Sequence, residues 1–113
     1  MKKIITALFC GVVSVNAFAG GNITKGAELA KKYNCAACHG ADYSSPIDPS
    51  YPKLAGQHAN YLEHALVSYK RSDGSFGRNN AIMAGQVANL SRKDMADLAA
   101  YLHSLPSQLV IKR

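Results

Sequence analysis

The sequence predicts a small all-α domain with three main helices and loops between them. Apolar side chains recur at helical spacing over 25–34, over 58–70 and between Ser91 and Pro106. The stretches between these segments are rich in glycine, proline and short polar residues, which is typical of loops. A chain of 113 residues suits one such domain.

Each predicted helix has its own local signals. Thr24 is the expected N-cap of the first helix, and Ser91 with Asp94 three residues later forms a variant of the capping box at the start of the last. Pro106 ends the last helix, which we expect to cross the first. In chain order, the apolar stripes are Leu29, Ala30 and Tyr33, then Tyr61, Leu62, Ala65, Leu66 and Tyr69, then Met95, Leu98, Leu102 and Leu105.

The segment from Cys35 to Gly40 carries the most specific motif of the chain. Cys35 and Cys38 are three positions apart and His39 follows at once, which is the Cys-x-x-Cys-His pattern of c-type haem attachment. Thiols at i and i+3 lie on one side of a helical turn, so both can form thioether bonds with the two vinyl groups of a haem. His39 is then placed to bind the iron as the proximal ligand. The motif therefore predicts one covalently bound haem c at the centre of the fold.

Two other interpretations of the paired cysteines are weaker. A structural zinc site takes four Cys or His ligands, and the sequence has no second ligand pair at similar spacing. A thioredoxin-like redox motif follows a strand in a βαβ unit, whereas the residues before Cys35 have a helical pattern. We therefore favour haem attachment.

A proline-rich loop follows the attachment motif and contains the pattern Pro52-x-Leu54-x-Gly56. The Pro52 carbonyl is available to accept a hydrogen bond from His39 Nδ1–H, which would fix the tautomer of the ring and raise its basicity toward iron. A turn that simply stops a helix explains the same residues equally well. The residues alone leave both interpretations open.

Met83 lies just beyond a polar, glycine-containing loop over 72–80. A thioether is a soft, neutral ligand for haem iron, and a loop residue can reach the face opposite the proximal histidine. Met95 falls on the buried stripe of the last helix and is better explained by packing. His58 and His64 have polar neighbours and are interpreted as surface residues. Met83 is therefore favoured as the sixth ligand over these residues or an open position.

Residues 1–19 are predicted to be a secretory signal peptide, which leaves 20–113 as a mature monohaem domain. Two lysines follow the initial methionine, an apolar run covers 4–15, and Ala17-Phe18-Ala19 offers a small-x-small cleavage site. Cleavage also removes Cys10, so no pair is left for a structural disulfide. The expected location of the mature chain is the periplasm.

Membrane anchoring of the N-terminal segment is the alternative to cleavage. Its apolar run is short for spanning a bilayer and is interrupted by Thr6, Ser14 and Asn16. Lipid attachment at Cys10 is disfavoured because the large Phe9 stands where a small residue is expected. We therefore expect no stable membrane insertion after export.

The charge of the chain does not indicate nucleic-acid binding. Thirteen basic residues stand against seven acidic ones, and loss of the two lysines in the signal segment leaves eleven against seven. The basic residues are dispersed along the chain rather than clustered. A solvated surface explains them more simply than a basic rim that steers an acidic redox partner.

Taken together, these segments resemble class I cytochromes c, most closely the small bacterial monohaem c553- and c5-like proteins and single halves of the dihaem cytochromes c4. The matching segments are Cys35-Ala-Ala-Cys-His39-Gly, Tyr51-Pro-Lys-Leu-Ala-Gly-Gln57, Met83-Ala-Gly-Gln-Val-Ala-Asn-Leu90-Ser and Asp94-Met-Ala-Asp-Leu-Ala-Ala-Tyr-Leu102. The resemblance implies covalent attachment by Cys35 and Cys38, axial ligation by His39 and Met83, and haem-pocket support by Pro52 and Leu54.

The expected function is one-electron transfer without substrate turnover, because both axial positions of the iron would be filled by side chains. The protein would shuttle electrons between respiratory partners such as a membrane oxidase or reductase complex or a periplasmic dehydrogenase. One alternative is a small electron-transfer subunit of a larger oxidoreductase. A haem peroxidase or a ligand sensor would instead need an open iron position.

Overall fold

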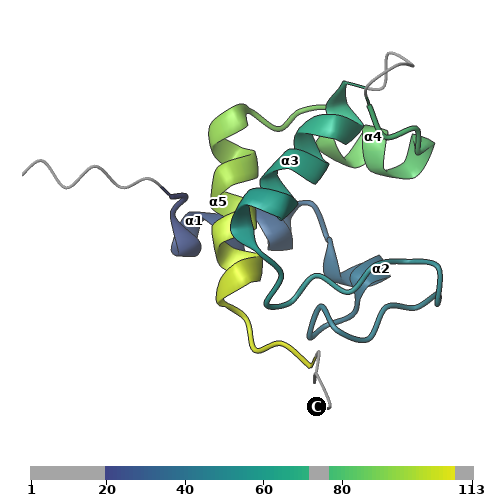
Figure 1. Cartoon of the computed structure of the whole chain (residues 1–113), viewed down its shortest axis with the longest axis vertical. Coiled ribbons are helices and arrows are strands. Elements are labelled where there is room, and N and C mark those ends of the chain that lie inside the picture. The colour runs from purple at the N-terminus through teal and green to yellow at the C-terminus, as the bar shows by residue number, and fades with distance from the viewer. Residues whose placement is uncertain (1–19, 72–76, 109–113) are drawn as a thin grey trace, which may run out of the picture.

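The structure is a computed structural model that describes residues 20–71 and 77–108, and within these ranges it contains helices and no strand. The predicted signal segment 1–19 lies outside the described residues. The all-α prediction is confirmed, with two short helices in addition to the three main ones (Figure 1). In chain order the helices are α1 Ile23–Lys32, α2 Ala36–His39, α3 Ala59–Lys70, α4 Ala81–Val87 and α5 Arg92–Ser104.

Helix α1 begins and ends two residues earlier than the sequence predicted. Its N-cap is Asn22, whose side-chain oxygen accepts a hydrogen bond from the Lys25 amide at 2.9 Å, so the assignment of Thr24 as cap was wrong. Both residue types are good caps, and the apolar stripe alone did not distinguish them. After the helix, Asn34 adopts a left-handed conformation with φ of 52° and turns the chain into Cys35.

Helix α5 keeps its predicted start and crosses α1, as expected (Figure 1). Ser91 and Asp94 form the reciprocal hydrogen bonds of a capping box, both at 3.0 Å. The crossing is close because of Gly26, where a Cβ atom would lie 2.0 Å from the Asp97 carbonyl oxygen. Only a residue without a side chain allows the backbones to approach this closely.

Gly26→Ala is therefore expected to lower the free energy of unfolding of the holoprotein by about 1–3 kcal/mol, because α1 has to move away from α5. The matched control is Gly85→Ala in α4, where a Cβ atom meets nothing within 4 Å. Alanine there is expected to stabilise the helix by about 0.5–1 kcal/mol. Denaturant unfolding of both variants checks the pair, and equal stability of the two would contradict the close-approach explanation.

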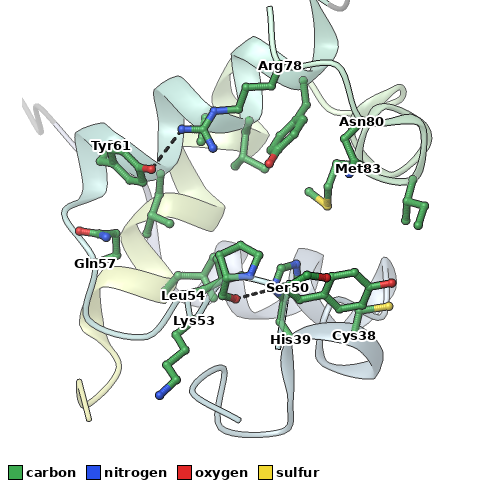
Figure 2. Close-up of a pocket in the computed structure, with 18 residues that line it drawn as sticks. Cys38, His39, Ser50, Lys53, Leu54, Gln57, Tyr61, Arg78, Asn80 and Met83 are labelled. Carbon is green, nitrogen blue, oxygen red and sulfur yellow. Dashed lines mark hydrogen bonds between the residues drawn. The ribbon is translucent and has the colours of Figure 1, made fainter. Parts of the chain in front are cut away.

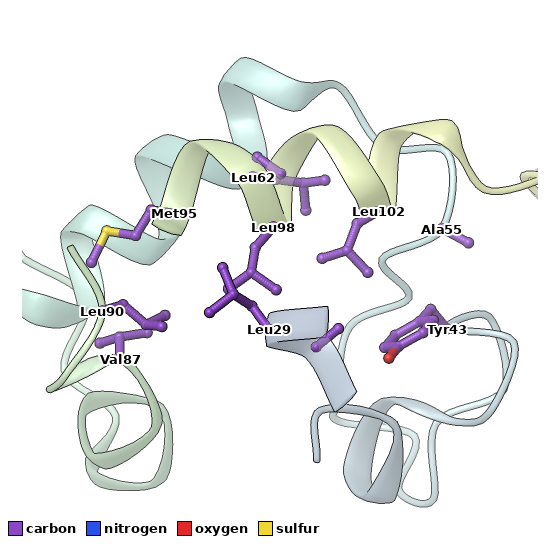
Figure 3. Close-up of a cluster of buried hydrophobic side chains, with 11 residues drawn as sticks. Leu29, Tyr43, Ala55, Leu62, Val87, Leu90, Met95, Leu98 and Leu102 are labelled. Carbon is purple, nitrogen blue, oxygen red and sulfur yellow. The ribbon is translucent and has the colours of Figure 1, made fainter. Parts of the chain in front are cut away.

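The apolar core lies mainly along α5 (Figure 3). Met95 has 1% of its surface exposed, which confirms that it is a packing residue. Figure 3 shows Met95 beside Leu90 and Val87 at one end of the cluster and Tyr43 at the other. The buried hydrophobic residues are Leu29, Ala30, Tyr43, Ala55, Leu62, Val87, Leu90, Met95, Leu98, Ala99 and Leu102.

One carboxylate is buried beside this core. Asp97 is 1% exposed and accepts hydrogen bonds from the Asn22 amide at 2.7 Å and from Lys93 Nζ at 2.9 and 3.1 Å. Burial alone would raise the pKa of Asp97, but the hydrogen bonds from Asn22 and Lys93 outweigh it and lower the pKa below its ordinary value. Asp97 therefore ties the start of α1 to the middle of α5 as an ionised group.

Within the described ranges, none of the helices combines the length and the apolar character that a membrane span requires.

Candidate functional site

The attachment motif forms a single helical turn in the structure. Cys35 precedes α2, Cys38 lies within it, and the His39 amide donates to the Cys35 carbonyl at 3.1 Å. Both thiols are free and half-buried. Burial raises the pKa of the Cys35 thiol, so this group is protonated at neutral pH. The two thiols therefore lie on one turn, as the spacing predicted.

A cavity of about 240 Å³ lies next to this turn (Figure 2). Its walls come from α2, the loop over 40–58, α3, the residues just before α4, the start of α4 and one residue of α5. Figure 2 shows His39 and Leu54 on one side and Met83 on the other. The lining residues are Cys38, His39, Ser50, Tyr51, Pro52, Lys53, Leu54, Gln57, Tyr61, Leu62, Ala65, Leu66, Tyr69, Arg78, Asn80, Ile82, Met83 and Leu102.

His39 is held in one orientation at the wall of the cavity. Its side chain is buried, and Nδ1 lies 2.9 Å from the Pro52 carbonyl oxygen. A carbonyl oxygen only accepts hydrogen bonds, so Nδ1 carries a proton, and in the neutral form of the ring Nε2 is the nitrogen with the lone pair. The contact that the sequence left open is thus present, and the imidazole has the tautomer that a metal ligand needs.

The loop over 40–58 is fixed by its own backbone. The Leu54 and Ala55 amides both donate to the Tyr43 carbonyl, at 2.8 and 3.1 Å. Gly40 turns the chain with φ of 89°, and a Cβ atom there would lie 2.3 Å from the Ser45 carbonyl oxygen. This loop therefore presents Leu54 to the cavity from a rigid support.

Met83 lies in α4, not in a loop as the sequence analysis expected. Asn80 caps this helix, and its side-chain oxygen accepts a hydrogen bond from the Met83 amide at 3.0 Å. The Met83 side chain is half-buried and lines the cavity from the wall opposite His39 (Figure 2). Helix α4 has seven residues, too few for apolar periodicity to reveal it.

A cationic group, Arg78, lies at the rim of the cavity, and no sequence pattern pointed to it. Arg78 Nη2 donates to the Tyr61 hydroxyl at 3.1 Å, and the guanidinium carbon is 5.5 Å from the ring centroids of both Tyr61 and Tyr69. Hydrogen bonding to Tyr61 is the largest cause that raises the pKa of Arg78, and hydrogen bonding to Tyr69 is the second. The tyrosines were predicted only as part of an apolar stripe, so their polar ends gave no separate signal.

His58 and His64 are exposed and do not line the cavity, which confirms their interpretation as surface residues. The zinc interpretation gains no ligands either, since residues 20–71 and 77–108 hold no cluster of three His, Cys, Asp or Glu side chains that could bind a metal. The thioredoxin-like interpretation lacks its strand, because α1 precedes Cys35.

The donor set of the cavity fits a haem. An imidazole nitrogen and a thioether sulfur face each other across it, a pair of thiols lies at one edge, and much of the lining is apolar. Leu54, Leu62 and Leu66 supply apolar surface for a flat ring. No side-chain nitrogen or oxygen buried in the described residues lacks a hydrogen-bond partner.

The fold and this cavity define a haem protein of the cytochrome c class, and the comparisons with known proteins agree. Residues 23–106 match the family model described as cytochrome c. The chain therefore belongs to the cytochrome c family, has the class I cytochrome c fold and binds one haem c.

Cytochrome c4 of Pseudomonas aeruginosa is 42% identical over 106 residues, which cover 92% of this chain and 49% of the relative. Cytochrome c-554(548) of Halomonas halodenitrificans is 43% identical over 70 residues, covering 62% of this chain and 82% of that protein. The crystal structure of reduced cytochrome c4 from Pseudomonas stutzeri has a TM-score of 0.66 at 35% identity, covering 76% of this chain and 46% of that one. The chain thus spans about half the length of the cytochrome c4 relatives that it matches.

Proposed function

We propose that the protein is a one-electron carrier whose haem c is attached to Cys35 and Cys38 and ligated by His39 and Met83. The observation that carries the proposal is the position of the His39 ring and the Met83 side chain on opposite walls of one cavity. Haem c supplies reversible one-electron oxidation and reduction, and a methionine ligand raises its reduction potential. With both axial positions filled by side chains, the iron has no position for a substrate.

The residues around the ligands favour this role. The hydrogen bond to the Pro52 carbonyl holds the His39 ring in place. Leu54 lines the same cavity and would supply apolar surface to the bound haem. The Asn80 cap fixes the first turn of α4, and with it the backbone of Met83. A largely apolar wall would limit the access of water to the bound haem and would keep the ligand geometry similar in both oxidation states, so that little reorganisation would accompany electron transfer.

The partners in this proposal are redox proteins, such as a membrane oxidase or reductase complex or a periplasmic dehydrogenase. Two large apolar side chains beside the cavity support a docking surface there: Ile47 is 71% exposed and Ile82 is 57% exposed. The Ile47 amide donates to the Cys38 carbonyl, which places Ile47 beside the attachment turn, and Ile82 lines the cavity from α4. Exposed apolar residues of this size favour contact with another protein.

We further propose that the mature chain begins at Gly20 and acts in the periplasm. The proposal rests on the basic start, apolar run and cleavage pattern of residues 1–19.

Absorption spectra of the protein purified from a periplasmic fraction test the carrier function. The ferric protein is expected to show the weak red band of methionine-ligated haem, and the ferrous protein to show low-spin bands and no carbon monoxide binding. Met83→Ala is expected to lose the red band and bind carbon monoxide, whereas the control Met95→Leu, in the core, keeps both wild-type properties.

High-spin iron or ready carbon monoxide binding in the wild-type protein would contradict the carrier proposal and favour an open-site peroxidase or sensor. The intact mass of the same sample tests export, since a chain starting at Gly20 with one haem is expected. A mass that includes residues 1–19 would contradict cleavage.

A further inference from the structure

We propose that Tyr51 is a positioning residue that sets the plane of the His39 imidazole when this ring is bound to haem iron. The proposal rests on the axial ligation in the proposed function, because the plane of the ring has a consequence only once Nε2 is a ligand. It adds a second contact, of a different kind, to the hydrogen bond that Pro52 makes with the same imidazole.

The rings of Tyr51 and His39 are in contact at the wall of the cavity. Their centroids lie 6.4 Å apart and their planes are inclined by 46°. Aromatic rings attract each other at centroid separations of about 4.5–7 Å in offset or tilted arrangements. Both side chains line the cavity, where His39 is buried and Tyr51 is half-buried. Tyr51 therefore limits how far the imidazole can turn toward it.

The hydrogen bond to Pro52 leaves this turning motion open. It joins His39 Nδ1 to the Pro52 carbonyl oxygen at 2.9 Å (Figure 2). A hydrogen bond weakens steeply only when the angle at the hydrogen falls below about 120°, so a single one tolerates a range of ring orientations. It fixes the position of Nδ1 more strictly than the plane of the ring. A neighbouring aromatic ring restricts the plane, because turning the imidazole drives its edge against the phenol.

The backbone of Tyr51 is itself fixed. Tyr51 precedes Pro52, and a residue before proline is restricted to extended conformations. The Tyr51 amide donates to the Asp48 carbonyl at 3.0 Å, and the Asp48 carboxylate accepts from the Ser50 amide at 2.7 Å. The hydrogen bonds from the Ser50 hydroxyl and amide lower the pKa of Asp48, so this acceptor is ionised at neutral pH. The turn thus presents the Tyr51 ring to His39 from a defined support.

The other aromatic side chains that line the cavity have a different neighbour. The rings of Tyr61 and Tyr69 both lie 5.5 Å from the guanidinium carbon of Arg78. The ring contact with His39 is made by Tyr51. Removal of the Tyr51 ring is therefore expected to act on the imidazole without disturbing the tyrosines on α3.

The plane of the imidazole has a measurable consequence in the ferric protein. In a low-spin ferric haem, the orientation of an axial imidazole decides how the unpaired electron density is distributed over the porphyrin. That distribution decides which part of the ring edge couples most strongly to a redox partner. The proton resonances of the haem methyl groups report it, because each is shifted according to the density beside it. An imidazole that samples several planes averages the density and narrows the range of these shifts.

Proton NMR of the ferric holoprotein tests the proposal. Tyr51→Leu keeps apolar bulk without a flat ring, and it is expected to shift the haem methyl resonances and narrow the range that they span. Tyr51→Phe keeps the ring without the hydroxyl and is expected to retain the wild-type range. The matched control is Tyr33→Leu, which removes a half-buried tyrosine ring from outside the cavity lining and is expected to match wild type.

A space-filling role alone predicts a different pattern. Tyr51→Leu would then lower thermal stability, but its methyl range would equal that of Tyr33→Leu, which overturns the proposal. Loss of the slowly exchanging His39 Nδ1 proton in Tyr51→Leu would mean that Tyr51 acts by holding Pro52, and this also overturns it. If Tyr51→Leu yields no folded holoprotein, Tyr51→Met decides by the same two criteria.

The red band of the same samples reports methionine ligation separately. A wild-type protein without this band, whose methyl range still narrows in Tyr51→Leu, would contradict Met83 as a ligand and support the role of Tyr51. A red band in every variant together with an unchanged methyl range would support Met83 and overturn the role of Tyr51. Failure of the proposed ligand set is thus distinguishable from failure of the positioning role.

Discussion

Replacing both Cys35 and Cys38 with serine is expected to leave a chain that does not hold its fold once haem is removed. The cavity between α2, α3 and α4 has a volume of about 240 Å³ and much of its lining is apolar. Without haem these apolar side chains lose their main packing partner and are exposed to water, which costs on the order of several kcal/mol. Small domains are stable by about 5–15 kcal/mol in total, so a cost of this size removes much of the stability.

Far-UV circular dichroism and one-dimensional NMR of the double variant after dialysis against a haem scavenger check this prediction. Lost ellipticity and poor chemical-shift dispersion are expected. The single variant Cys38→Ser is the control, because one thioether bond retains the haem and with it the fold. A well-dispersed spectrum of the haem-free double variant would show that the protein core alone suffices.

Asp97→Asn is expected to lower the free energy of unfolding of the holoprotein at neutral pH by about 2–3 kcal/mol. The side chain is buried and accepts hydrogen bonds from the Asn22 amide and the Lys93 ammonium. Hydrogen bonds to a charged acceptor contribute about 1.5–3 kcal/mol. An amide side chain of the same shape accepts weaker hydrogen bonds, and its NH2 group would face one of the two donors, the Asn22 amide or the Lys93 ammonium. The control Glu28→Gln alters an exposed ion pair with Lys25 and is expected to cost less than about 1 kcal/mol.

The loss of stability caused by Asp97→Asn is expected to depend on pH. The pKa of Asp97 is lower in the folded protein than its ordinary value, so its stabilising effect is fully present above the unfolded-state pKa of about 4. The effect is lost as the pH falls through the folded-state pKa. In urea unfolding, the difference in the free energy of unfolding between wild type and Asp97→Asn is therefore expected to become smaller below about pH 4. A gap that is constant from neutral to acid pH would contradict the assignment of an ionised Asp97.

Local signals predicted the helices well where they were complete. The Ser91–Asp94 capping box and Pro106 bracket α5 closely because each acts through neighbouring residues. Helix α3 ends at Lys70 as predicted. Two acceptable caps close together, Asn22 and Thr24, left the start of α1 ambiguous, and a hydrogen bond from the Asn22 amide to the distant Asp97 anchors the first of them.

In the candidate site, too, contacts between residues far apart in the sequence were harder to predict than local features. The contact between His39 and Pro52 was open at the sequence level, because a proline-rich turn has a sufficient local explanation. The contact between Arg78 and Tyr61 joins residues 17 positions apart, and each has an ordinary interpretation on its own. They meet because the Arg78 backbone is bonded to Ser68 of α3, and a contact of this kind leaves no periodic trace in the sequence.

The residues that form the core and those that line the cavity are almost separate sets, and this separation has a consequence for protein engineering. Among the described residues, the buried hydrophobic cluster and the cavity lining share only Leu62 and Leu102. Leu54, Leu66, Tyr69 and Met83 line the cavity and also pack against the cluster, and Cys38, His39 and Met83 are the proposed haem-binding residues. Side chains at the remaining lining positions can therefore be varied to adjust the midpoint potential without repacking the α1–α5 crossing. Substitutions that raise stability and substitutions that adjust the reduction potential can thus be selected in separate libraries and then combined in one variant.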